Sequence, residues 1–262
     1  MFYKFQYDLL QSIIQGTLED VKSLQVGEAE VNMPLFPGEE TSYGGNEQED
    51  LYIQGPTPLI LAILVQKEDI VAYLLNISDL GIPVEGLYPI HYAVMNDSIG
   101  IINMILRKDP LELERRSENL YTPLHIACSG TNPKVVYYLL SNGADPNAQS
   151  NSGSTPLHIA VTGDSLEIIC LLFKFGARTD VMNYCKKTPM MVAEEFGEQE
   201  WVDDVKQVEE QASKMLKSDM AKMYEEKEYS TDQSVQINFL MGKIRELTER
   251  INVLESSSKK PE

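Results

Sequence analysis

The stretch Ser154–Asn183, STPLHIAVTGDSLEIICLLFKFGARTDVMN, has the features of a helix–turn–helix unit. Thr155 can cap a helix with its hydroxyl, and Pro156 suits the first helical position, where no backbone donor is needed. His158 follows the cap by three residues, so its ring can reach back to the threonine. The second helix is expected to place apolar residues at helical spacing, namely Leu166, Ile169, Cys170, Leu172 and Phe173. One such unit cannot bury its own apolar faces, so the stretch predicts stacked neighbours.

The same motif recurs along the chain. Copies begin at Thr57, Tyr88, Thr122, Thr155 and Thr188, at steps of 31 to 34 residues, and an alanine follows each start by five residues. With its Thr-Pro-Leu-His core and a period of about 33 residues, the pattern resembles the ankyrin repeat. This resemblance implies an all-α fold, an α-solenoid of helix–turn–helix units with β-turn tips.

The predicted ankyrin-repeat array spans residues 1–199, with about six repeats anchored near positions 7, 57, 88, 122, 155 and 188. The stretch from Tyr7 to Asn32 keeps the apolar positions but lacks the Thr-Pro pair, as a terminal repeat would. Surplus residues between the first two anchors lie in an acidic insertion at 33–50. Their Pro, Gly and acidic content predicts a surface loop, either ordered and functional or disordered.

The C-terminal part differs in character. Residues 200–229 show apolar side chains at three- and four-residue steps and predict an amphipathic extension helix. Residues 233–256 predict a short coiled coil, followed by a disordered tail at 257–262. Its heptad seam consists of Ile237, Leu240, Ile244, Leu247, Ile251 and Leu254. Isoleucine at a and leucine at d favour two parallel strands, and about three heptads need a partner helix. That helix belongs to a second copy, to another protein, or to the array itself.

Composition restricts the partners. The chain has 262 residues, 43% of them hydrophobic, and a net charge of −18. Such acidity argues against nucleic acid and anionic membranes. The charge lies at the flanks, with −8 over residues 1–55, −3 over 56–193 and −7 over 194–262. It either solvates the array ends or forms a docking surface for a basic partner. No signal peptide or membrane-length apolar run is apparent, so a cytoplasmic location, with or without the cytoskeleton or a cilium, is expected.

Residues with chemical potential are few. The three histidines, His91, His125 and His158, share one repeat position, where capping and bracing of the turn explain them. Cys128 and Cys170 are expected to be small core residues, and Cys185 has no partner at metal-site spacing. Nucleotide-loop motifs are absent. The sequence therefore predicts a protein that is not an enzyme, without metal, cofactor or small-molecule substrate.

The resemblance implies that turn tips and inner helices form a concave protein-binding surface. Leu87, Leu120 and Tyr121 are expected at the tips, rimmed by a basic group and one more tyrosine: Arg115, Arg116, Lys187 and Tyr184. Together they would form an aromatic and basic patch of the type found in binding hot spots; ordinary turn chemistry is the alternative. Leu120 replaces the glycine of other repeats, where a positive φ is predicted.

Three functions follow as hypotheses. The first is an adaptor, with the ankyrin surface gripping one protein and the coiled coil joining another helix or a second copy. The second is a structural subunit of a cytoskeletal or ciliary (axonemal) assembly. The third is a regulatory or inhibitory subunit of another protein. The repeat family alone does not choose among them.

Overall fold

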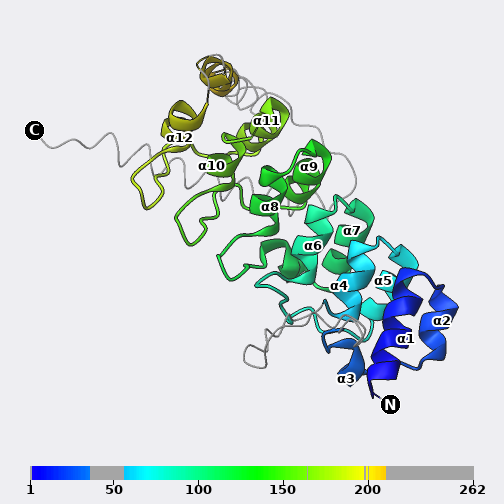
Figure 1. Cartoon of the computed structure of the whole chain (residues 1–262). Helices are drawn as coiled ribbons and strands as arrows, with labels where there is room; N and C mark the ends of the chain where they lie inside the picture. The colour runs from blue at the N-terminus through cyan, green and yellow to red at the C-terminus, as the bar shows by residue number, and fades with distance from the viewer. Residues whose placement is uncertain (1, 36–55, 164, 198, 200, 211–262) are drawn as a thin grey trace, which may run out of the picture.

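The computed structural model describes residues 2–35, 56–163, 165–197, 199 and 201–210. Over these residues the chain forms an elongated stack of helix pairs without a β-strand (Figure 1). The predicted all-α solenoid is confirmed. Residues 36–50 of the predicted insertion, 211–229 of the extension helix, the coiled coil at 233–256 and the tail at 257–262 lie outside the described residues.

The helices form two layers. The inner layer consists of α1 (Phe2–Ile14), α4 (Pro58–Leu64), α6 (Pro89–Met95), α8 (Pro123–Ser129), α10 (Pro156–Ala160) and α12 (Pro189–Phe196). The outer layer consists of α2 (Leu18–Ser23), α5 (Glu68–Leu75), α7 (Ile99–Lys108), α9 (Pro133–Ser141), α11 (Leu166–Lys174) and residues 201–210. Two short helices, α3 (Glu28–Val31) and the 3-10 helix η1 (Pro110–Glu114), lie in connections. Each inner helix packs against the next inner helix, which produces the stack.

The Thr-Pro pairs start the inner helices as expected. The hydroxyls of Thr57, Thr122 and Thr188 accept from the amide three residues later, at 3.4, 3.4 and 3.3 Å. The following proline occupies the first helical turn, where its missing donor costs nothing. The motif therefore fixes where each repeat begins.

One apolar seam runs between the two layers. The alanines after each motif, Ala62, Ala93, Ala127, Ala160 and Ala193, are all buried, and their small size lets neighbouring helices approach closely. The outer helices contribute larger side chains, such as Ile70, Leu74, Ile102 and Ile105. Burying each such side chain contributes about 2 kcal/mol, so most of the stability comes from contacts between neighbouring repeats.

The burial of the cysteines agrees with the prediction at Cys128 and differs from it at Cys170. Cys128 is buried as expected, and burial raises the pKa of its thiol, which therefore stays neutral. The expectation for Cys170 was wrong, because this side chain is exposed. The buried face of α11 is formed by Ile168, Ile169, Leu172 and Phe173. An α-helix turns by about 100° per residue. Cys170 lies one residue after Ile169 and two residues before Leu172, so its side chain points away from that face.

Candidate functional site

Turn tips connect each outer helix to the next inner helix. Three of them, 117–121, 150–154 and 183–187, close alike: the amides of Ser117, Ser150 and Asn183 each donate to the carbonyl four residues later at 2.9 Å. The tip 84–87 is shorter, since Val84 and Leu87 exchange two backbone hydrogen bonds of 2.9 Å. Its central residues, Glu85 and Gly86, both have positive φ, as two-residue hairpin turns require. This tighter turn accounts for a shorter repeat.

One tip position holds the left-handed backbone conformation. Its φ is +75° at Gly153, +56° at Leu120 and +61° at Lys186. The prediction for Leu120 is confirmed, whereas Lys186 was not foreseen. A side chain with a Cβ in this conformation costs about 1 kcal/mol, so two of the tips retain strain.

Backbone hydrogen bonds also join one tip to the next. Glu118 N donates to Gly86 O at 3.0 Å, Asn151 N donates to Asn119 O at 3.0 Å, and Tyr184 N donates to Ser152 O at 2.9 Å. The tips therefore form a continuous strip along one side of the array (Figure 1).

Each histidine links an inner helix to the following tip. Nδ1 of His91, His125 and His158 accepts from the amide three residues earlier, at 3.0, 3.1 and 3.1 Å. Their Nε2 atoms face the carbonyls of Tyr121, Ser154 and Lys187, at 3.2, 3.1 and 3.0 Å, and donate to them. The predicted capping and bracing role is confirmed.

Burial keeps these imidazoles neutral. It lowers the pKa of all three rings, and that of His91 to about 4, although the carbonyl contacts act in the opposite direction. Both ring nitrogens of each histidine are engaged with backbone groups, so these rings hold the tips in place. Within the described residues, no group of three His, Cys, Asp or Glu side chains is placed to hold a metal ion.

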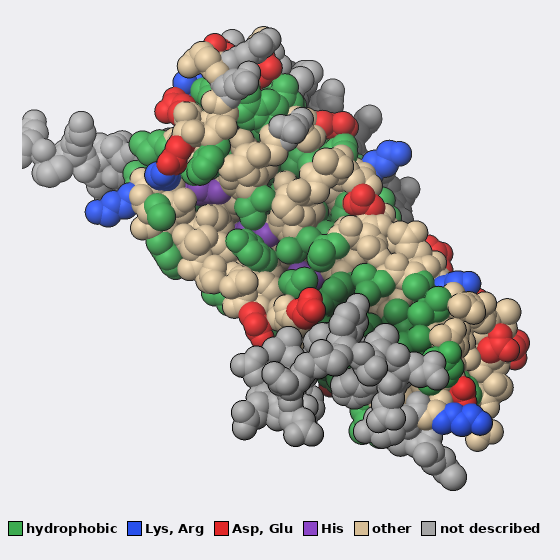
Figure 2. Space-filling view, in the orientation of Figure 1, with side chains coloured by type: hydrophobic (Ala, Val, Ile, Leu, Met, Phe, Trp, Pro, Cys, Tyr) green, Lys and Arg blue, Asp and Glu red, His purple; other side chains and the backbone are tan. Residues whose placement is uncertain are grey.

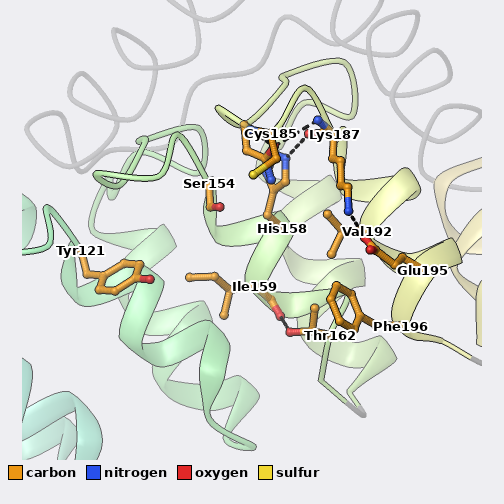
Figure 3. Close-up of a pocket in the computed structure, with 11 residues that line it drawn as sticks. Tyr121, Ser154, His158, Ile159, Thr162, Cys185, Lys187, Val192, Glu195 and Phe196 are labelled. Atoms are coloured by element: carbon orange, nitrogen blue, oxygen red, sulfur yellow. Dashed lines mark hydrogen bonds and ion pairs between the residues drawn. The ribbon is translucent and has the colours of Figure 1, made fainter.

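A groove of about 350 Å³ lies between the tips and the inner helices (Figure 3). Ile159 and Val192 form its floor, and Tyr121 and Phe196 face it from opposite sides. The remaining lining residues are polar: Ser154, His158, Thr162, Asn183, Cys185, Lys187 and Glu195. The Nζ of Lys187 forms an ion pair with Glu195 at the rim. Phe196 is 71% exposed, so its ring projects from the end of α12 beside the groove.

The predicted tip residues are spread over successive tips. Tyr121 and Lys187 line the groove. Leu120 is exposed at its tip, whereas Leu87 is half-buried in the tight turn. Tyr184 is 74% exposed at the last tip, and its ring lies against Gly153, where an added Cβ would approach Cδ1 to 2.8 Å.

The two arginines differ in their surroundings. The Arg115 guanidinium forms an ion pair with the buried Glu112 and lies 4.9 Å from the centre of the Tyr88 ring. The hydrogen bonds that Arg115 donates to the Glu112 carboxylate raise the pKa of Arg115. Arg116 is exposed, and its Nη1 donates to Gln149 O at 3.1 Å. Arg115 therefore holds its loop in place, and Arg116 faces solvent.

Sequence reasoning missed the part of the groove formed by inner helices: Ile159, Thr162, Val192, Glu195 and Phe196. A usable signal was present, because Thr162 and Glu195 follow the motif alanine by two residues. The same position in other repeats holds Leu64, Met95 and Ser129, and all five side chains are exposed. These exposed side chains differ between repeats at one fixed position, so they vary the surface from one inner helix to the next.

None of the described helices has both the length and the apolar character that spanning a membrane requires.

Comparison with known proteins gives consistent matches. The family pattern described as "Ankyrin repeats (3 copies)" matches residues 59–150 and 124–205. The human ankyrin and armadillo repeat-containing protein is 39% identical over 98 residues, which are 36% of this chain and 7% of that protein. Mouse protein phosphatase 1 regulatory subunit 27 is 37% identical over 68 residues, 26% of this chain and 44% of that protein. Human ankyrin repeat domain-containing protein 53 is 30% identical over 101 residues, 36% and 19% of the two chains. The similarity thus covers less than half of each relative's length.

Proposed function

This chain belongs to the ankyrin-repeat family, and from that premise we propose that it is a non-enzymatic adaptor that grips a protein partner in the groove between α10, α12 and the tips. Ankyrin repeats imply protein–protein interaction, and the histidines on this surface are consumed in holding the tips. The observation that carries the proposal is the groove itself, which places the half-buried Tyr121 and the exposed Phe196 beside polar groups. Binding hot spots have this composition.

The test uses a double variant of the groove, Tyr121→Ala with Phe196→Ala, in the full chain. Proteins captured from an extract by chemical cross-linking are compared with those captured by the parent. We expect capture of groove partners to fall about tenfold or more, because hot-spot truncations cost 2 kcal/mol or more.

The matched control is Leu111→Ala, which removes an apolar side chain that is 80% exposed on η1, outside the groove lining. Circular dichroism melting verifies that each variant is folded. Equal capture by the double variant and the control would eliminate the groove as the partner site.

The second half of the adaptor proposal concerns residues 233–256. Their seam of Ile237, Leu240, Ile244, Leu247, Ile251 and Leu254 supports joining a second copy or a helix of another protein. An acidic chain with two separate contact regions would connect two partners, in the cytoplasm or within a cytoskeletal or ciliary assembly.

A regulatory subunit is the second candidate, because one relative is named protein phosphatase 1 regulatory subunit 27. Calorimetric titration of protein phosphatase 1 into the full chain would test it. Binding that the Tyr121→Ala, Phe196→Ala variant abolishes would support this role, and absence of heat change at micromolar concentrations would exclude it.

A further inference from the structure

Four consecutive inner helices carry no formal charge. The segments PLILAIL of α4, PIHYAVM of α6, PLHIACS of α8 and PLHIA of α10 contain no Lys, Arg, Asp or Glu. The imidazoles among them are neutral because burial lowers their pKa. Figure 2 shows uncharged surface over the middle of this face, with most charged side chains towards its margins. Charged side chains occur on the two terminal inner helices of the described array, with Lys4 and Asp8 on α1 and Glu194 and Glu195 on α12.

The exposed row on these helices changes along the array. It runs from apolar Leu64 and Met95 through the small hydroxyls of Ser129 and Thr162 to Glu195. The residues that follow Ser129 and Thr162 are glycines, whereas Phe196 follows Glu195. The surface is therefore recessed near Ser129 and Thr162, and the phenyl ring of Phe196 projects at one end of this recess. This arrangement produces the hollow over Ile159 and Val192 (Figure 3).

The tips beside the hollow have the opposite charge to the whole molecule. Of the three tips that contribute lining residues, 150–154 is uncharged, while the stretches 115–121 and 183–187 contain Arg115, Arg116, Lys186 and Lys187 against Glu118 alone. Arg115 and Lys187 are paired with Glu112 and Glu195, whereas Arg116 and Lys186 are exposed to solvent. A basic edge on a chain of net charge −18 is a local feature that an acidic segment would complement.

We propose that the groove accepts a peptide segment of a partner protein with an uncharged, apolar centre and carboxylates on the flank that passes the tips. The apolar centre fills the hollow between Tyr121, Ile159 and Phe196. A charged side chain there would lose water next to α8 and α10, which carry no charge, while Lys187 and Glu195 in the lining already neutralise each other in an ion pair. The acidic flank lies near Arg116 and Lys186. This inference rests on the proposed function and adds the chemistry of the partner.

The first experiment displays random dodecapeptides and selects them on the full chain, in parallel with the Tyr121→Ala, Phe196→Ala variant. Peptides lost on the variant are groove-dependent. We expect these peptides to have apolar, uncharged centres, to be depleted of Lys and Arg there, and to be enriched in Asp and Glu on one flank.

The second experiment uses one groove-dependent peptide in solution. Replacing its flanking carboxylates by amides should weaken binding about threefold to tenfold, and Arg116→Glu with Lys186→Glu should remove that preference. Thr162→Lys, a change at an exposed position, should weaken binding of the uncharged centre about tenfold. Circular dichroism confirms that both variants remain folded.

The outcomes separate the two proposals. Groove-dependent peptides with Lys or Arg at the centre, or without dependence on flanking carboxylates, would overturn the inference while leaving the protein-binding groove intact. Recovery of no groove-dependent peptide would overturn both.

Discussion

Leu120 and Lys186 hold a backbone conformation that Gly153 adopts at the equivalent tip without a steric cost. Both side chains are exposed, so neither gains core contacts that would offset the strain. Backbone strain that is retained at an exposed position suggests that the side chain serves recognition. We therefore expect the Leu120 and Lys186 side chains to make contacts outside the chain; each is adjacent in sequence to a residue that lines the groove, Tyr121 and Lys187.

Replacing Leu120 by glycine should stabilise the array. Relief of the left-handed strain contributes about 1 kcal/mol, and the extra freedom of glycine in the unfolded chain removes part of it, leaving a gain of about 0.5 kcal/mol. Urea unfolding followed by circular dichroism measures the change. Leu120→Ala is the control, because alanine keeps the Cβ and the strain. A glycine variant no more stable than the alanine variant would contradict this account.

Acid should destabilise the protein through His91. Its pKa is 6.5 in an ordinary environment and about 4 in the folded chain, where burial opposes protonation. The unfolded chain binds more protons between these values, so this contribution is fully present above pH 6.5 and is lost as the pH falls towards 4. The loss amounts to about 3 kcal/mol at most.

Urea midpoints at pH 7.0, 6.0 and 5.0 would measure this effect. His91→Gln serves as the reference: it should be less stable at pH 7 but should show a smaller loss across the range. Parallel pH profiles for the two proteins would place the acid sensitivity elsewhere.

The sequence was informative for side chains whose role depends on near neighbours. Three-residue spacing identified the histidine contact with the cap, and the missing glycine identified the conformation of Leu120. Cys170 was assigned to the wrong face, since cysteine is compatible with core and surface, and only packing of α11 decides. Lys186 was missed because lysine gives no signal for a left-handed turn.

The repeat pattern did not predict the 3-10 helix η1, which lies in the connection between α7 and α8. Its Glu112 side chain is 0% exposed, and the paired Arg115 side chain is 33% exposed. The second carboxylate oxygen of Glu112 has no hydrogen-bond partner among the described residues. The connection between α7 and α8 thus contains a 3-10 turn in which Arg115 neutralises the buried Glu112.

Removing either partner of this pair should have unequal effects. Arg115→Met leaves a buried carboxylate without its counter-charge and should cost about 3 kcal/mol. Glu112→Gln leaves a guanidinium that can reach water and should cost about 1 kcal/mol. Urea unfolding of both single variants and of the double variant measures the difference. Equal losses would show that the carboxylate is not held by Arg115 alone.

The inner and outer helices were predictable because their apolar residues recur at helical spacing, and because Thr57, Thr122 and Thr188 cap three of the inner helices. Residues 201–210 are helical in the structure, with Val202 and Val205 buried and Nε1 of Trp201 donating to Val161 O at 3.1 Å. Trp201 and Val205 were expected on the apolar face. The groove was not foreseen in the same way, because its volume depends on small side chains of one repeat meeting a phenyl ring of the next.

For the molecule as a whole, the described repeats contact only their neighbours, so binding at the groove and at the C-terminal seam should be separable. A chain ending at Ser230 should keep the partners that require Tyr121 and Phe196 and lose those that require Ile244 and Leu247. Affinity capture followed by mass spectrometry, with light scattering on both proteins, measures this. Loss of all partners on truncation would show that the two regions act together.

Main-chain bonds from Glu118 to Gly86, from Asn151 to Asn119 and from Tyr184 to Ser152 set the distance between tips. Because these hydrogen bonds join backbone amides and carbonyls, they do not involve the side chains that project from the tips. The outward-facing side chains of the tips can therefore be substituted, by evolution or by design, while the spacing between the tips stays constant. The backbone thus fixes where each tip presents its side chains, and the sequence decides which side chains are presented.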